Sequence, residues 1–114
     1  MPGVVVIAVN SCFSVLLSGP EVWFYADGSK QYEAAWRGGV KTGRETYWLP
    51  DGKIAWMWEH RADGTSLWTQ YWPNGKKKHE SEWKDGKCVG TATAYKLSGE
   101  EEAKYTFQDG FLKK

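Results

Sequence analysis

The chain has 114 residues, and its 15 Lys and Arg against 14 Asp and Glu give a formal net charge of +1. This length leaves room for one domain at most, and the even charge balance excludes the basic surface with which proteins hold the phosphate backbone of nucleic acids. Because the chain carries 8 Trp, 6 Tyr and 4 Phe, aromatic rings rather than aliphatic side chains are expected to supply the buried surface.

The first 20 residues are uncharged and mostly apolar. Such an N-terminal run is typical of a signal peptide and is too short to span a membrane comfortably. The stretch Val9-Asn10-Ser11-Cys12 also resembles the cleavage box of bacterial lipoproteins. Alternatively, residues 3–17 form an extra strand or hairpin that turns at Asn10-Ser11 and covers the first hairpin after residue 20, or the start codon is mis-assigned. An export signal would place the protein in the cell envelope or outside the cell, and otherwise it is expected in the cytoplasm.

From residue 21 onward the sequence repeats. An aromatic pair or single ring followed by a tight turn recurs four times, and the glycines of these turns are spaced by 24, 23 and 24 residues: Gly28, Gly52, Gly75 and Gly99. A second glycine follows each of them after 11 residues, or after 12 in unit two: Gly39, Gly64, Gly86 and Gly110. A period of this length indicates a repeat array. We therefore predict an N-terminal segment, 1–20, and a repeat domain, 21–114, of about four units of 23–24 residues.

Between the turns, rings alternate with polar or charged residues at a period of two. Tyr105 and Phe107, for example, alternate with Lys104 and Thr106. Successive side chains of a strand point to opposite faces, so one face should carry a stripe of rings and the other a stripe of charges. The expected fold is all-β: an elongated, twisted, single-layer antiparallel meander of β-hairpins.

Turn chemistry sets the expected strand ends. Gly reaches positive φ without a Cβ penalty, and Pro50 and Pro73 end the strands before two of the turns. The expected strands are residues 21–25, 30–36, 44–49, 53–60, 66–72, 77–83, 91–96 and 101–107. In this register one face should hold Trp36, Trp58, Trp83 and Phe107, all more buried than Glu33, Glu59, Glu82 and Lys104. Replacing Trp83 by Ala should then cost about 3–5 kcal/mol.

The pattern is most regular at Tyr-Trp-Pro-Asn-Gly-Lys in residues 71–76 and Trp-Lys-Asp-Gly-Lys-Cys-Val-Gly in residues 83–90. It resembles the MORN repeat, particularly the bacterial variant of YwqK-type antitoxin-like proteins, over about residues 21–114. Unit two departs from the repeat at residues 62–67, and unit four lacks Pro and Lys around Ser98-Gly99. The resemblance implies a non-enzymatic hairpin array that contacts other proteins. It also implies membrane-lipid association or an antitoxin role as alternatives.

Few residues are arranged for catalysis or metal binding. His60 and His79 are the only histidines, and both fall on the predicted ring face, where a packed His is commoner than a base or ligand. Cys12 and Cys88 match no zinc or disulfide spacing. We expect no enzyme activity, no cofactor and no metal. A further alternative is that the rings stack on a sugar or hold a quaternary ammonium such as choline through cation–π contacts.

A protein partner is the expected ligand of the opposite face. Because one ring of each adjacent pair must point away from the ring stripe, a partly exposed row is expected from Tyr47 or Trp48, Tyr71 or Trp72, and Tyr95. Such rings are common binding anchors. Residues 3–17 could instead cover this row. The C-terminal strand, 101–107, is expected at the sheet edge, where its charges oppose pairing with another chain.

Overall fold

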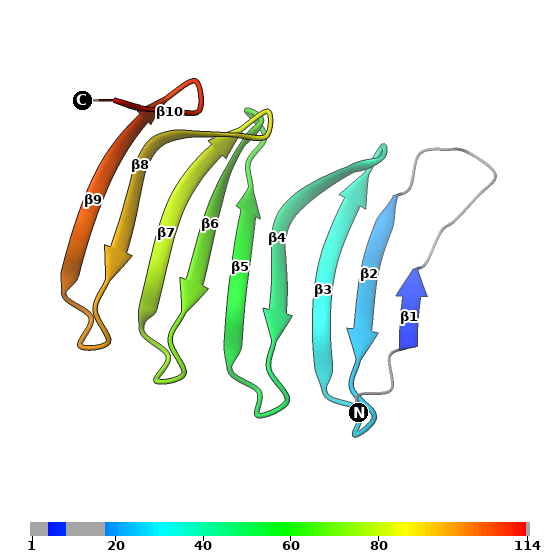
Figure 1. Cartoon of the computed structure of the whole chain (residues 1–114). Coiled ribbons are helices and arrows are strands. Elements are labelled where there is room, and N and C mark those ends of the chain that lie inside the picture. Colours follow the sequence, from blue (N-terminus) through cyan, green and yellow to red (C-terminus); the bar gives the residue numbers. More distant parts are fainter. Residues whose placement is uncertain (1–4, 9–17, 114) are drawn as a thin grey trace.

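The computed structural model describes residues 5–8 and 18–113, and this part of the chain forms strands and no helix (Figure 1). No helix in the described residues could therefore cross a membrane. In chain order the strands are β1 (Val5–Ala8), β2 (Gly19–Phe24), β3 (Lys30–Arg37), β4 (Val40–Trp48), β5 (Ile54–His60), β6 (Thr65–Tyr71), β7 (Lys77–Lys84), β8 (Lys87–Tyr95), β9 (Glu101–Gln108) and β10 (Phe111–Lys113).

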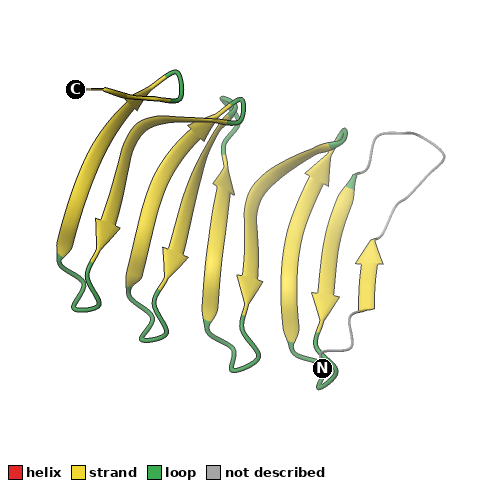
Figure 2. Ribbon diagram, in the orientation of Figure 1, coloured by secondary structure: helices red, strands yellow, loops and turns green. Residues whose placement is uncertain are grey.

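All described strands belong to one open sheet, and each pairs antiparallel with the next strand in the sequence. Figure 2 shows the strands side by side in a single curved layer, with short loops between successive strands from β2 to β10. The sheet extends over 47 × 33 × 19 Å. The predicted all-β meander of hairpins is confirmed.

Six of the eight expected strands lie within two residues of their predicted bounds, but β4 and β8 each begin four residues earlier than expected. The turns before them contain only two residues, so the chain re-enters the sheet at once. Gly43 and Gly90, which precede the expected strands 44–49 and 91–96, lie inside β4 and β8 with positive φ values of 66° and 65°. The pairing register shifts opposite both glycines. These glycines therefore shape β-bulges rather than turns.

The first turn of each unit, at Gly28, Gly52, Gly75 and Gly99, has the same hydrogen bonds in all four units. At Gly75, the Trp72 N–H donates to the Lys76 carbonyl over 2.7 Å, and the Gly75 N–H donates to the Trp72 carbonyl over 2.9 Å. This is a three-residue loop in which the glycine takes a positive φ, here 86°. The same two bonds recur at Gly28, Gly52, Gly64 and Gly99.

The second kind of turn has two central residues, both with positive φ. Gly38-Gly39, Asp85-Gly86 and Asp109-Gly110 have φ values of 57° and 83°, 52° and 76°, and 53° and 84°. This geometry matches the right-handed twist of the flanking strands, and it explains why Asp-Gly and Gly-Gly stand there.

Unit two owes its irregular spacing to a change of turn. Its second turn, at Gly64, is of the three-residue kind, and the pairing of β5 with β6 has no register shift. The neighbouring hairpins have the shorter turn and a bulge at Gly43 or Gly90. The extra residue of unit two thus lies in its turn, and the hairpin needs no bulge.

The ring face of the sheet is the face that carries Trp23, Tyr32, Trp56, Trp58, Trp68 and Trp83. These rings form a continuous chain of contacts from β2 to β7, with ring centroids 4.9–6.2 Å apart. Each such pair contributes about 0.5–1.5 kcal/mol beyond its buried area. The rings therefore link the hairpins into one array.

The register prediction is right, but the predicted difference in burial is seen only between Phe107 and Lys104. Strand pairing connects Trp36, Trp58, Trp83 and Phe107 on the ring face. All four rings are half-buried, as are Glu33, Glu59 and Glu82 on the other face, whereas Lys104 is exposed. A single-layer sheet leaves both faces in contact with water, so burial does not separate the two stripes.

The two ends of the described sheet differ from expectation. β9 is not the last strand, because β10 pairs with its end over Thr106–Gln108. At the other end β1 pairs with β2, in the plane of the sheet. Over residues 5–8 this agrees with the alternative of an extra N-terminal strand. The expected turn at Asn10-Ser11 and the lipoprotein box with Cys12 lie outside the described residues.

Candidate functional site

The aromatic row lies on the row face, which is the face opposite the ring face. Its members occupy the last position of strands β2, β4, β6 and β8, four residues before the turn glycine of their unit: Phe24, Trp48, Tyr71 and Tyr95. All are half-buried. Because neighbouring strands are about 4.8 Å apart and the row uses every second strand, its rings repeat at roughly 10 Å.

Two of the predicted site residues lie elsewhere. Tyr47 points to the ring face, where it stacks on Trp56 with centroids 5.5 Å apart and planes 10° apart. Trp72 lies just beyond β6, where its Nε1–H donates to the Tyr95 carbonyl over 3.2 Å. Trp72 thus fastens one unit to the next. The structure therefore assembles Trp48, Tyr71 and Tyr95 from the predicted set.

Phe24 is a member of the row that the sequence analysis did not include. It stands four residues before Gly28, as Trp48 stands before Gly52. The glycine series alone was thus enough to find it.

A β-bulge in the following strand lies opposite each row residue, and in three of the four units it places charged residues beside the row. Each row residue faces a register shift in the next strand. The shift lets residues three apart meet on the row face, as in the ion pairs Lys30–Glu33, Lys77–Glu80 and Lys104–Glu101, with N–O distances of 3.2, 2.9 and 3.3 Å. Unit two has Ile54 and Met57 at these two positions.

The surroundings of Trp48 are consequently the most apolar part of the row. A shallow hollow of about 330 Å³ opens beside Trp48 and includes Ile54 and Met57 in its lining. Glu33 and Arg44 also line it and supply charges of both signs. The row therefore has an apolar centre with a charged border.

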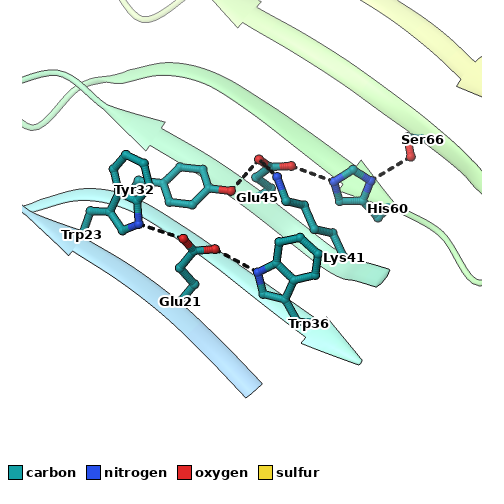
Figure 3. Close-up of polar contacts among 8 residues, drawn as sticks. All are labelled: Glu21, Trp23, Tyr32, Trp36, Lys41, Glu45, His60 and Ser66. Carbon is teal, nitrogen blue, oxygen red and sulfur yellow. Dashed lines mark hydrogen bonds and ion pairs between the residues drawn. The ribbon is translucent and has the colours of Figure 1, made fainter. Parts of the chain in front are cut away.

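On the ring face, two carboxylates occupy equivalent positions, seven residues before Gly28 and Gly52. Glu21 accepts hydrogen bonds of 2.9 Å from the indole Nε1–H groups of Trp23 and Trp36. Glu45, which is only 6% exposed, accepts bonds from Tyr32 Oη (2.6 Å) and Lys41 Nζ (2.7 Å) (Figure 3).

The buried Glu45 carboxylate is stabilised in its charged form. Burial opposes its ionisation, but the hydrogen bonds from Lys41, Tyr32 and His60 outweigh burial and hold the pKa of Glu45 below its usual range. Burial and the bond to Glu45 raise the pKa of Tyr32. Glu45 is therefore an anion shared by three donors.

The Glu45 cluster also contains a Ser–His–carboxylate chain. Ser66 Oγ lies 2.8 Å from His60 Nδ1, and His60 Nε2 lies 2.9 Å from Glu45 Oε1. These are the residue types of a hydrolase triad, in which the carboxylate stabilises the imidazolium. Here the charge of Glu45 is already offset by Lys41 at 2.7 Å. The chain is therefore suited to holding His60 in place more than to activating Ser66.

This cluster was not predicted from the sequence, because its members are brought together only by strand pairing. Glu45 is one of 14 acidic residues, and Ser66 lies in the irregular part of unit two. Among the residues that the structure describes, no group of three His, Cys, Asp or Glu side chains is placed to hold a metal.

The fold and these two faces define the chain as an open, all-β array of hairpin repeats. No family model, curated protein or solved structure matches this chain.

Proposed function

We propose that this protein is a non-enzymatic repeat module that binds a protein partner on its row face. The observation that carries the proposal is the alignment of Trp48, Tyr71 and Tyr95, with Phe24, at one repeat position. Tyr and Trp combine a large contact area with few rotatable bonds, which suits them as anchors.

The border of the row supports a protein ligand. Protein interfaces commonly have an apolar centre within a polar rim. The row has this arrangement, with the apolar residues Ile54 and Met57 beside Trp48 and ion pairs in the neighbouring units. The resemblance to MORN repeats favours the same class of function. Lipid association or an antitoxin role would be forms of binding by the same array.

The test is a double variant, Trp48→Ala with Tyr71→Ala, compared with Tyr105→Ala. Tyr105 is 52% exposed and lies on the ring face, because it pairs with Ala92 and so with Ser81 and Trp68. Each variant is used as bait for partners from the native cell, and affinity for the recovered partner is then measured with purified proteins.

We expect the double variant to weaken binding at least about a hundredfold, since truncation of an anchor residue costs about 2 kcal/mol or more. The Tyr105→Ala variant should bind like the wild type. A folded double variant that keeps its affinity would exclude the row as the binding site.

The non-enzymatic part of the proposal has its own test. Hydrolysis of an activated ester is compared between the wild type and Ser66→Ala. Equal rates are expected, because Lys41 already neutralises Glu45. A rate that depends on Ser66 would assign a hydrolytic role to the chain of Ser66, His60 and Glu45.

A further inference from the structure

Strand pairing identifies one position that recurs in each hairpin on the ring face. Near the second turn, a residue of the first strand stands directly opposite a residue of the second strand. The pairs are Trp36 with Lys41, His60 with Ser66, Trp83 with Cys88, and Phe107 with Leu112. The second residue is long in the first hairpin, where it is Lys41, and short in the next two, where it is Ser66 and Cys88.

In the first of these hairpins, Lys41 fills the space with its own ammonium group. Its Nζ lies 5.3 Å from the centroid of the Trp36 ring and 5.8 Å from that of Tyr32. Both distances are within cation–π range. The same Nζ is 2.7 Å from Glu45 Oε2. Figure 3 shows the Lys41 side chain running between the Trp36 ring and the Glu45 carboxylate.

In the next hairpin the equivalent residue is Ser66, which is too short to fill the space. Its hydroxyl is bonded to His60 Nδ1 at 2.8 Å. A hollow of about 190 Å³ opens there, lined by Trp58, His60, Ser66 and Trp83 and by the nearby turns. We call it the Trp58–Trp83 hollow. It is smaller than sites for drug-sized ligands, so it suits a compact group.

The walls of the hollow are aromatic. The rings of Trp58 and Trp83 have centroids 6.2 Å apart and planes at 69°, so they meet as a corner. His60 stacks against Trp58 at 5.8 Å and 12°. A cation in this corner would lie close to the electron-rich faces of both indoles.

The charges at the hollow select the kind of cation. Among its lining residues Asp85 is acidic and Lys84 basic, and both are exposed. The position equivalent to Glu45, seven residues before the turn glycine, is Trp68 in this unit. A primary ammonium would thus lack a buried carboxylate partner such as the one that Lys41 has, because Asp85, the acidic residue of the lining, is exposed. A trimethylammonium group has no N–H to satisfy, so rings alone suit it.

We propose that the Trp58–Trp83 hollow binds a trimethylammonium group. The site lies on the ring face, and so it is independent of the protein-binding row. The group could belong to free choline or to the headgroup of phosphatidylcholine.

Two substitutions exchange the residues at the equivalent positions 41 and 66, where Lys41 fills the space beside it and Ser66 leaves it open. Ser66→Lys supplies the ammonium that Lys41 provides one hairpin earlier, and Lys41→Ser opens the earlier position. Binding of choline is measured by calorimetry and by tryptophan fluorescence, with dimethylbutanol, the neutral isostere of choline, as the ligand control. We expect choline to bind at least about tenfold more tightly than dimethylbutanol. We also expect Ser66→Lys to weaken choline binding by at least about tenfold, and Lys41→Ser to raise the number of choline sites.

A second variant guards against misfolding of Ser66→Lys. Trp83→Leu keeps an apolar side chain but removes one ring of the corner, and it should also lose choline binding by about tenfold. Equal binding of choline and dimethylbutanol would overturn the proposal. So would undiminished choline binding by folded Ser66→Lys, or no choline binding by the wild type.

Co-sedimentation with vesicles separates the two sources of the group. Pelleting with phosphatidylcholine vesicles, but not with phosphatidylglycerol vesicles, and its loss in Ser66→Lys would assign a lipid headgroup. Choline binding without pelleting would assign a free small molecule.

Discussion

Replacing Glu45 by Gln should destabilise the sheet, because the carboxylate is the shared partner of three side chains. Its side chain is only 8% exposed, whereas that of Lys41 is 32% exposed and can reach water once the anion is gone. Hydrogen bonds to a charged group contribute about 1.5–3 kcal/mol each, but an amide keeps one acceptor and Lys41 recovers part of its hydration. We therefore expect a loss of roughly 3 kcal/mol, or about 10 °C in Tm.

The assay is urea unfolding and thermal unfolding followed by tryptophan fluorescence. The matched control is Glu33→Gln, whose ion pair with Lys30 has side chains 41% and 49% exposed. An exposed pair contributes about 0.2–1 kcal/mol, so this variant should stay close to the wild type. The reasoning is refuted if Glu45→Gln costs no more than Glu33→Gln.

Three further predictions concern stability. The folded pKa of Glu45 lies below its unfolded value, so its contribution to the free energy of unfolding is complete above about pH 4.3 and is lost as the pH falls through the folded pKa. Acid unfolding curves should therefore show a smaller loss of stability for Glu45→Gln than for the wild type. Gly90→Ala should lower the free energy of unfolding by about 2 kcal/mol, because φ is 65° and the new Cβ would lie 2.8 Å from Glu82 Oε1. An unchanged free energy in urea unfolding would contradict the assignment of a β-bulge at Gly90. Trp83→Ala should lower the free energy of unfolding by about 2 kcal/mol, because this ring is half-buried and the usual range applies to fully buried rings. A loss of about 4 kcal/mol or more, at the upper end of that range, would show that something covers the ring face.

The sequence by itself determined the strands, their order and the position of most turns. These features depend on local rules: alternation decides which side chains share a face, and glycine at a reversal decides where a strand ends. Alternation also predicted a row made of one ring from each pair, Tyr47 or Trp48 and Tyr71 or Trp72, together with Tyr95. The choice of Trp48 and Tyr71 came from the structure.

Only the tertiary structure decided where the register of strand pairing shifts. Whether Gly43 and Gly90 belong to turns or to bulges depends on the number of residues in the facing strand, which no single segment contains. The meeting of Ser66, His60 and Glu45 depends on the pairing of three strands. Burial also could not be predicted, because it depends on whether a second layer covers the sheet. In the described part of the chain none does, and so rings and charges on the two faces are similarly exposed.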